Sequence, residues 1–236
     1  HYKEINSNNL LAYKGYLLEK FKPQTVNLRL QGMNKFLEFI KQDKLKMKFV
    51  KVQQKNFLEN VISNEDYKFL KTRLKNDGYE EWYFVVWFMT ATGARVSELL
   101  QIKAEHITAG HLDIYTKGGK IRRLYIPQIL KNEAVVWLRS KGISSGYIFL
   151  NRFGKRITTR GIAQQLKHFA DKYGLKREVV YPHSFRHRFA KNFLDRFNDI
   201  ALLADLMGHE SIETTRIYLR RTATEQRAIV DKVVTW

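Results

Sequence analysis

Apolar side chains recur at helical spacing in the first quarter of the chain. Between residues 26 and 40 they are separated by four, three, four and three positions, which places them on one face of a helix. They are Val26, Leu30, Met33, Leu37 and Ile40, and Phe36 and Phe39 widen the stripe. Pro23 suits the first turn of this helix, and leucines at 10, 11, 17 and 18 fit a shorter helix before it. We expect residues 1–58 to form a small helical domain with a thin core that continues N-terminally of residue 1.

Residues 59–236 combine helical patterns with one pair of strands. Ser63 and Asp66 form a capping pair at the start of a helix. Residues 82–89 are apolar on all sides, which is typical of a buried central helix. His111–Thr116 and Ile121–Ile126 are predicted to be the strands of a β-hairpin. Shorter elements are expected as helices over residues 132–139 and 162–169 and a strand over residues 147–150. The pattern predicts a mainly α fold with a small antiparallel β-sheet, an α+β class.

Cap residues divide the stretch from residue 181 to residue 218 into short helical pieces. Asp199 is suited to be the N-cap of a helix over residues 200–207, and Gly208 fits the position after its end. Ser211 can cap a final helix in the same way. The chain therefore turns sharply on either side of residue 209, and we expect the pieces to pack against one another.

Four polar side chains fall at defined places in this stretch. His183 and Arg186 are three residues apart and share one helix face. His209 follows a helix end, and Tyr218 lies on the second turn of the final predicted helix. If the pieces pack together, these side chains form a site for an anion and an aromatic hydroxyl.

Each of these residues alone also fits a structural role. His209 can serve as a helix-end cap, and Tyr218 as a core aromatic residue. Arg186 can pair with Asp195 or Glu178. Only the joint pattern favours a functional site.

A second candidate region follows the predicted buried helix. Arg95 comes directly after it, so its side chain is expected to be partly buried and to need an anionic partner. Glu98, three residues on, can be that partner, or a ligand phosphate can be, with Glu98 orienting the guanidinium. Spacing alone leaves these two interpretations open. Lys117 and Lys120 lie in the hairpin turn, where a lysine is usually just solvated.

The positive charge is the strongest compositional signal. The net charge is +19 and the pI about 10.0. Residues 1–58 hold twelve Lys or Arg against four Asp or Glu, and the remainder is also basic. Such a balance favours a polyanion, with nucleic acid first. An anionic membrane surface would instead favour one basic amphipathic helix, and we expect no membrane partner.

Other chemistries lack their sequence patterns. His183 and His187 have a spacing that zinc can use, but no HExxH motif or further ligand is evident. The chain has no G-x-S-x-G elbow and no P-loop. It has no cysteine, no apolar run of membrane-spanning length and no signal peptide at its start, so we expect a reducing, cytoplasmic setting.

Five short stretches, in their order, together resemble the tyrosine recombinase family, which includes Xer-type and phage-integrase-type site-specific recombinases. No single stretch would be specific. The resemblance covers residues 60–220 closely and residues 5–58 loosely, as the helical core-binding domain of that family. The stretches are Ala91 to Leu99 (ATGARVSEL), Lys117 to Lys120 (KGGK), His183 to His187 (HSFRH), Leu206 to His209 (LMGH) and Thr214 to Tyr218 (TTRIY).

The resemblance implies cleavage and rejoining of DNA strands without metal, cofactor or ATP. Tyr218 would attack the scissile phosphate and form a 3′-phosphotyrosyl bond, with His183 as the base. Arg95 and Arg186 would hold the phosphate oxygens, because their planar charged forks match them.

The remaining implied roles concern the leaving group, the support of the site and DNA contact. Lys117, or as second choice Lys120, would protonate the leaving 5′-oxygen. His209 would add a hydrogen bond to the phosphate, and Glu98 would support the site. The candidate DNA-contacting residues are Arg29, Lys35, Lys120 and Arg122.

The implied partner is double-stranded DNA with inverted-repeat core sites. The resemblance also implies a homotetramer on DNA, joined through the C-terminal tail after Tyr218, and a monomer or dimer when free. A bacterial, archaeal or mobile-element source fits this picture. Alternatives are a DNA-binding relative without cleavage, a type IB topoisomerase-like relaxase and an RNA-binding module, the last disfavoured by the lack of an aromatic strand motif.

Overall fold

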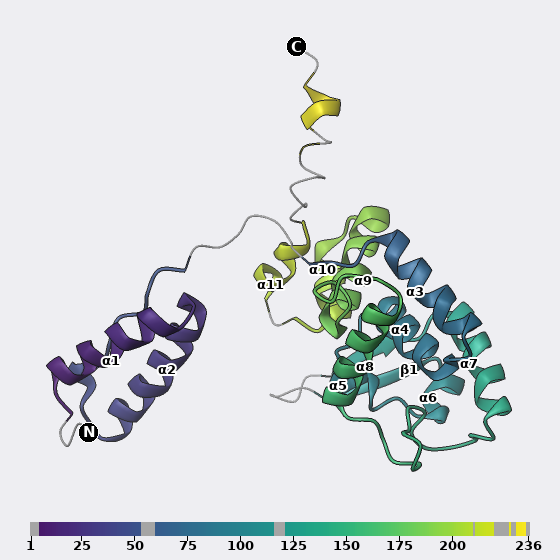
Figure 1. Ribbon diagram of the computed structural model, residues 1–236, viewed down its shortest axis with the longest axis horizontal. Coiled ribbons are helices and arrows are strands. Elements are labelled where there is room, and N and C mark those ends of the chain that lie inside the picture. The colour runs from purple at the N-terminus through teal and green to yellow at the C-terminus, as the bar shows by residue number, and fades with distance from the viewer. Residues whose placement is uncertain are drawn as a thin grey trace. The chain divides into compact units, whose positions relative to one another are not determined.

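Two compact units make up the chain, residues 1–55 and residues 56–236, in the computed structural model (Figure 1). The structure describes residues 5–52, 60–115, 121–209, 211–219, 227 and 230–234. Within these ranges helices dominate, and the strands form one two-stranded antiparallel sheet. The predicted fold class is therefore confirmed.

The first unit is a pair of helices, α1 (Ser7–Lys20) and α2 (Pro23–Phe39), followed by the 3-10 turn η1 (Asp43–Leu45). Pro23 occupies the start of α2, as predicted. The core is small, with Leu17, Val26 and Leu30 fully buried. Phe39, predicted to widen the apolar stripe, is instead 83% exposed, because two helices cannot enclose so broad a face.

Two asparagines hold the segment after η1 against α2. The Asn27 side chain exchanges hydrogen bonds of 2.9 and 2.8 Å with the backbone of Val50, and Asn34 exchanges bonds of 2.9 and 2.8 Å with Met47. The side chains of Met47 and Val50 pack against the small core of this unit. The first part of the Lys-rich stretch therefore belongs to this unit rather than to a free linker.

The second unit is built around one buried helix. α3 (Asn64–Asn76) starts at the predicted Ser63 cap, whose Oγ accepts from the Asp66 N–H at 2.9 Å. α4 (Glu80–Thr92) follows and is buried along most of its length, as predicted. It contacts α3, α7 (Gln128–Ser140) and α9 (Pro182–Phe197). α4 thus packs against α9, the helix that carries His183 and Arg186.

The sheet lies beside this helical core. β1 (His111–Tyr115) pairs antiparallel with β2 (Ile121–Tyr125), with His111 opposite Tyr125, so the predicted hairpin strands are confirmed. α5 (Val96–Leu99) and α6 (Ala104–Ala109) precede it, and α8 (Thr159–Lys172) comes before α9. α10 (Ile200–Met207), α11 (Ile212–Arg216) and the 3-10 turn η2 (Ile217–Leu219) complete the unit.

The strand predicted over residues 147–150 does not form. The structure has isolated bridges from Lys103 to Tyr147 and from Leu150 to Arg156 in its place. Ile148 and Phe149 are nevertheless buried, as their apolar side chains favour. An apolar run of four residues becomes a strand only if a neighbour offers a continuous edge.

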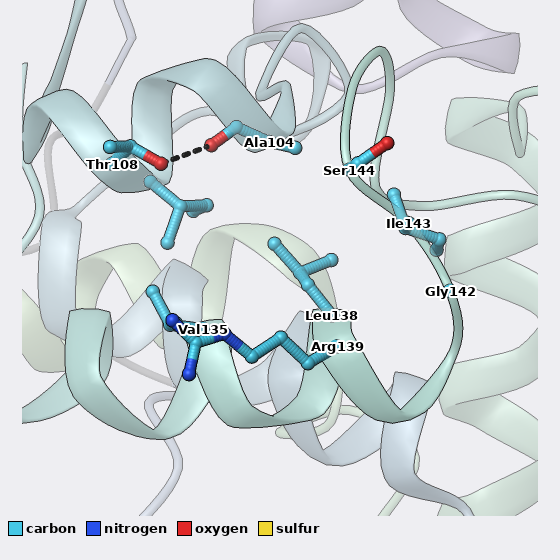
Figure 2. A pocket seen from close by; sticks show the side chains of 9 residues that line it. Ala104, Thr108, Val135, Leu138, Arg139, Gly142, Ile143 and Ser144 are labelled. Atoms are coloured by element: carbon cyan, nitrogen blue, oxygen red, sulfur yellow. Dashed lines mark hydrogen bonds between the residues drawn. The ribbon is translucent and has the colours of Figure 1, made fainter.

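A pocket of about 420 Å³ is lined by residues of both α6 and α7 (Figure 2). None of the predicted site residues lines it. Its walls are mostly aliphatic, with the Arg139 side chain along α7 near Val135, and Ile143 and Ser144 on the segment after α7 (Figure 2). Among the described residues, no helix has the length and apolar character needed to cross a membrane.

Candidate active site

Three consecutive helices, α9, α10 and α11, position the C-terminal part of the site, and their caps set the turns between them. The Asp199 side chain accepts from Leu202 N–H at 2.9 Å at the start of α10, and Gly208 adopts a φ of +62° at its end. Ser211 caps α11 by accepting from Glu213 N–H at 3.2 Å. All three caps are as predicted. α11 is shorter than expected, and Tyr218 lies on the 3-10 turn after it.

A buried carboxylate, Glu98, organises the arginines. Its Oε2 accepts from the Arg95 backbone N–H at 2.7 Å and from Arg122 Nη1 at 2.7 Å. Its Oε1 accepts from Arg95 Nη1 at 2.8 Å. Burial alone would raise the pKa of Glu98, but the Arg122 charge and the hydrogen bonds from both arginines hold it below the ordinary value. Glu98 is therefore ionised at neutral pH.

Glu98 reconciles the two interpretations left open by spacing. It pairs with Arg95 and at the same time orients it, since Arg95 Nη2 reaches the Gly208 carbonyl at 3.2 Å. The Arg95 side chain remains 36% exposed and can meet a ligand. Arg95 can therefore pair with Glu98 and bind a ligand at the same time.

Arg186 is the most deeply placed of the predicted arginines, with only 3% of its surface exposed. Its Nη1 donates to the Gly93 carbonyl at 2.5 Å, and its Nη2 to the Met207 carbonyl at 2.6 Å. Burial and the charge of Arg95 lower its pKa to about 10, so it stays protonated at neutral pH. It pairs with neither Asp195 nor Glu178; its anionic neighbour is Glu98, at 3.8 Å.

His209 lies between Arg186 and α11. Its Nε2 is 3.2 Å from Arg186 Nη2, and its Nδ1 is 2.8 Å from Thr215 Oγ1. Burial, followed by the charges of Arg186, Arg95 and Arg122, lowers the pKa of His209 to about 4. The imidazole is neutral near pH 7.

Tyr218 packs inside this cluster, with 6% of its surface exposed. Its ring stacks on His209, with centroids 6.1 Å apart and an interplanar angle of 10°, and lies 5.3 Å from the ring of His187. Burial raises the pKa of the phenol, although the charge of Arg186 and a hydrogen bond from it act in the opposite direction. The hydroxyl is therefore protonated at neutral pH.

His183 occupies the exposed edge of the site on the first turn of α9. Burial and the charges of Arg186 and Arg95 lower its pKa, so it is neutral and able to accept a proton. Its ring is 6.4 Å from His187, which in turn contacts Tyr218. The described contacts connect His183 to the nucleophile candidate through His187.

The other predicted site residues are differently placed. Lys117 and Lys120 lie outside the described residues. The guanidinium carbon of Arg29 lies 4.0 Å from the centroid of the Phe21 ring. Lys35 Nζ forms an ion pair with Glu38 Oε2 at 3.1 Å on the surface of α2. Both belong to the first unit.

Arg122, which we predicted as a DNA-contacting residue, is buried. Only 5% of its surface is exposed, and its Nε donates to the Leu206 carbonyl at 2.8 Å. Its guanidinium supports Glu98, and its Nη2 is a buried donor without a described protein partner. A residue held in this way supports Glu98, and a contact between Arg122 and DNA stays a prediction.

Sequence reasoning missed three residues of this cluster: Arg122 as a partner of Glu98, His187 and Thr215. His187 carried a signal, because it follows Arg186 directly and lies one helical turn from His183. The sequence gives a weaker signal for Arg122 and Thr215, because their partners Glu98 and His209 are known only from the folded chain. Thr215 does lie three residues before Tyr218, on the face of α11 that points inward.

The cluster is electropositive. Three guanidiniums surround one carboxylate, and the neutral imidazoles add no negative charge. Because the Arg95 side chain is partly exposed at the edge of the cluster, an incoming anion can reach its guanidinium. The arrangement can bind a phosphate next to a phenol hydroxyl.

The family and its relatives agree with this geometry. The profile of the phage integrase family matches residues 58–225, more than half of the chain. The tyrosine recombinase XerA of Pyrococcus furiosus is 31% identical over 230 residues, which cover 94% of this chain and 77% of that protein.

Solved structures share the fold. The XerH recombinase bound to its difH substrate aligns over 97% of this chain and 70% of its own, with a TM-score of 0.71 and 21% identity. The Tn1549 transposon integrase in complex with transposon right end DNA aligns over 100% of this chain and 87% of its own, with a TM-score of 0.73 and 14% identity. The resemblance seen in the sequence is confirmed, and the chain belongs to the phage integrase family of tyrosine recombinases, enzymes of site-specific DNA recombination.

Proposed function

We propose that Tyr218 is the nucleophile of this recombinase and that it attacks a DNA phosphate held by Arg95, Arg186 and His209. The observation that carries the proposal is the position of the phenol: its ring stacks on His209, whose Nε2 is 3.2 Å from Arg186 Nη2. The attack forms a 3′-phosphotyrosyl bond and releases a 5′-hydroxyl. The 5′-hydroxyl of the partner strand reverses the step, so the phosphodiester energy is retained.

The arginines stabilise the transition state. The pentavalent phosphorane carries extra negative charge on its equatorial oxygens, and fixed positive groups lower its energy without reorganising. Glu98 holds Arg95 by two hydrogen bonds, and the carbonyls of Gly93 and Met207 hold Arg186. These hydrogen bonds orient the two guanidinium groups before DNA binds.

The phenol must lose its proton as it attacks. An unperturbed tyrosine has a pKa of about 10, and burial raises the pKa of Tyr218 further. The arginines therefore do not ionise the free phenol, and a base is required. His183 is the proposed base because it is neutral and at the open edge; His187, in ring contact with Tyr218, is the group through which the proton can pass.

The leaving 5′-oxygen must gain a proton, and we assign this role to Lys117, with Lys120 as the alternative, on the family pattern. Lys117→Ala should slow cleavage of ordinary DNA but spare a substrate with a 5′-thiolate leaving group, which leaves without protonation. Equal loss on both substrates would remove Lys117 from this role.

The partner is double-stranded DNA with inverted-repeat core sites, bound by a tetramer. XerH has been solved on difH and the Tn1549 integrase on transposon end DNA, which supports a DNA complex of this kind. The tail after Tyr218 would join neighbouring protomers; Val230 and Val233 are exposed and available for such a contact. Deletion of residues 222–236 should abolish assembly on DNA, and unchanged assembly would exclude the tail from this role.

The test is covalent trapping. The protein is mixed with nicked genomic fragments from its own source, denatured, and examined for protein linked to DNA. Tyr218→Phe should form no adduct, whereas the matched variant Tyr181→Phe, at the N-cap of α9, should retain it. An adduct that persists in Tyr218→Phe would contradict the proposal.

A further inference from the structure

Thr215 is a fully buried hydroxyl residue in the wall of the site. It lies on α11, three residues before Tyr218, and has 0% of its surface exposed. Its Oγ1 is 2.8 Å from His209 Nδ1. A buried hydroxyl costs free energy unless it is paired, so this contact fixes the helix that leads to Tyr218 against His209.

The direction of the hydrogen bonds follows from Arg186. A guanidinium can only donate, so the 3.2 Å contact from Arg186 Nη2 makes His209 Nε2 the acceptor. In a neutral imidazole the other nitrogen then carries the hydrogen. His209 Nδ1–H therefore donates to Thr215 Oγ1 in the free protein.

A bound phosphate reverses these requirements. Its oxygens accept hydrogen bonds, so His209 can contribute only if Nε2 carries the hydrogen. Nδ1 then becomes an acceptor and needs a donor. A hydroxyl is both donor and acceptor and rotates to suit, so Thr215 can serve His209 in both states.

We propose that Thr215 is a positioning residue that allows His209 to change from an Nδ1–H to an Nε2–H tautomer when phosphate replaces its contact with Arg186. The inference rests on the proposed role of His209. The imidazole loses one proton from Nδ1 and gains one at Nε2 by exchange with water, so its charge is unchanged. Thr215 turns its hydroxyl from accepting to donating, and α11 keeps its place.

The neighbouring residue Thr214 provides a matched control. It lies on the same helix but is exposed. Thr215→Val keeps the shape and removes the hydroxyl, Thr215→Ser keeps the hydroxyl, and Thr214→Val makes the same chemical change outside the site. The three variants separate the hydroxyl of Thr215 from its packing.

The experiment is long-range ¹⁵N–¹H NMR of histidine-labelled protein near pH 7, with His209→Gln to assign the His209 signals and inorganic phosphate as the probe. We expect the Nδ1–H pattern in the free protein and the Nε2–H pattern at saturating phosphate. Thr215→Ser and Thr214→Val should behave like the original chain. Thr215→Val should keep the Nδ1–H pattern in the free protein, because Arg186 still donates to Nε2. It should fail to reach the Nε2–H pattern at saturating phosphate, because Nδ1 then has no donor.

The opposite results overturn the inference. They are a free protein with the hydrogen on Nε2, a Thr215→Val variant that changes to the Nε2–H pattern as fully as the original chain, or no change in the original chain on addition of phosphate. In the trapping assay Thr215→Val should form adduct roughly tenfold more slowly, with no further loss when combined with His209→Ala. Full adduct formation by Thr215→Val, together with none by Tyr218→Phe, would reject this inference and leave the proposed function standing.

Discussion

The two units of the chain carry the same sign of charge but differ in where their described cations lie. In the first unit the cations are at the surface: Lys35 is 73% exposed and pairs with Glu38, which is 49% exposed. In the second unit Arg122 and Arg186 are 5% and 3% exposed and are held by a carboxylate and by backbone carbonyls. Among the described residues, buried cations occur only in the second unit, which also has exposed cations such as Lys75 and Arg216.

The difference separates attraction from chemistry. Exposed pairs add little stability and are screened by salt, but exposed cations draw in a polyanion from a distance. Buried charges are costly unless paired, and once paired they stay in a fixed geometry. The second unit therefore has the preorganised donors that a reaction at phosphorus needs, whereas the exposed cations described in the first unit are suited to attracting a polyanion.

Glu98→Gln should produce the largest change. It removes the anion that three arginines surround, and breaking a buried charge pair costs about 3–5 kcal/mol. We expect an unfolding free energy lower by about 3 kcal/mol and loss of the covalent adduct. Urea unfolding followed by tryptophan fluorescence measures it in the second unit, which contains every tryptophan of the chain.

Glu38→Gln is the matched change in the first unit. It should leave hydrogen exchange of α1 and α2 unchanged, because its partners Lys35 and Lys46 are solvated. A loss of protection equivalent to about 3 kcal/mol, the loss of unfolding free energy expected for Glu98→Gln, would contradict the distinction between the two units.

Gly93→Ala should have the next largest effect. Gly93 has a φ of +64°, and an added Cβ would lie 2.4 Å from Cδ1 of Phe189 in the helix that carries Arg186. Gly142→Ala at a φ of +67° meets nothing within 4 Å, so it reports the backbone strain alone. We expect a loss of about 1 kcal/mol in Gly142→Ala and of about 2–3 kcal/mol in Gly93→Ala. Equal losses would mean that the α4–α9 contact is not tight.

Acid should destabilise the second unit through its histidines. Burial lowers the pKa of His187 and His209 to about 4 in the folded chain, below the ordinary value of 6.5. The unfolded chain therefore binds protons first, and stability present above pH 6.5 is lost as the pH falls towards 4. We expect roughly 1 kcal/mol per histidine between pH 7 and pH 5. His209→Asn should flatten the pH dependence of urea unfolding, and an unchanged slope would show that His209 is not buried as described.

Lys35→Gln should have the smallest effect and only on DNA affinity. If Lys35 contacts one phosphate, the slope of log K against log salt should fall by about 1. Folding of the first unit should stay the same. Titrations of fluorescent duplex DNA at several salt concentrations measure the slope, and an unchanged slope would exclude a phosphate contact by Lys35.

Local chemistry predicted the parts of the structure that depend on neighbouring residues. Asp199, Gly208 and Ser211 adopt the cap positions expected of them, because a cap needs only the residues three or four positions away. The hairpin and the buried helix α4 follow from equally local patterns. These features are the framework of the site.

Long-range packing decided what the sequence could not predict. Arg122 bonds to Leu206, 84 residues away, so its burial is a property of the assembled unit. The strand expected over residues 147–150 failed for lack of a paired edge, and Phe39 remained exposed because the first unit is too small to cover it. The family pattern named the candidate reacting groups, but only the folded chain shows Thr215 beside His209.

The most direct test of the account is to identify the residue linked to DNA. Trapped adducts would be digested with protease and nuclease, and the peptide carrying a nucleotide would be sequenced by mass spectrometry. The account predicts a 3′-phosphonucleotide on Tyr218 and a free 5′-hydroxyl on the released strand. A nucleotide on any other residue, or a 5′-phosphate linkage, would contradict it.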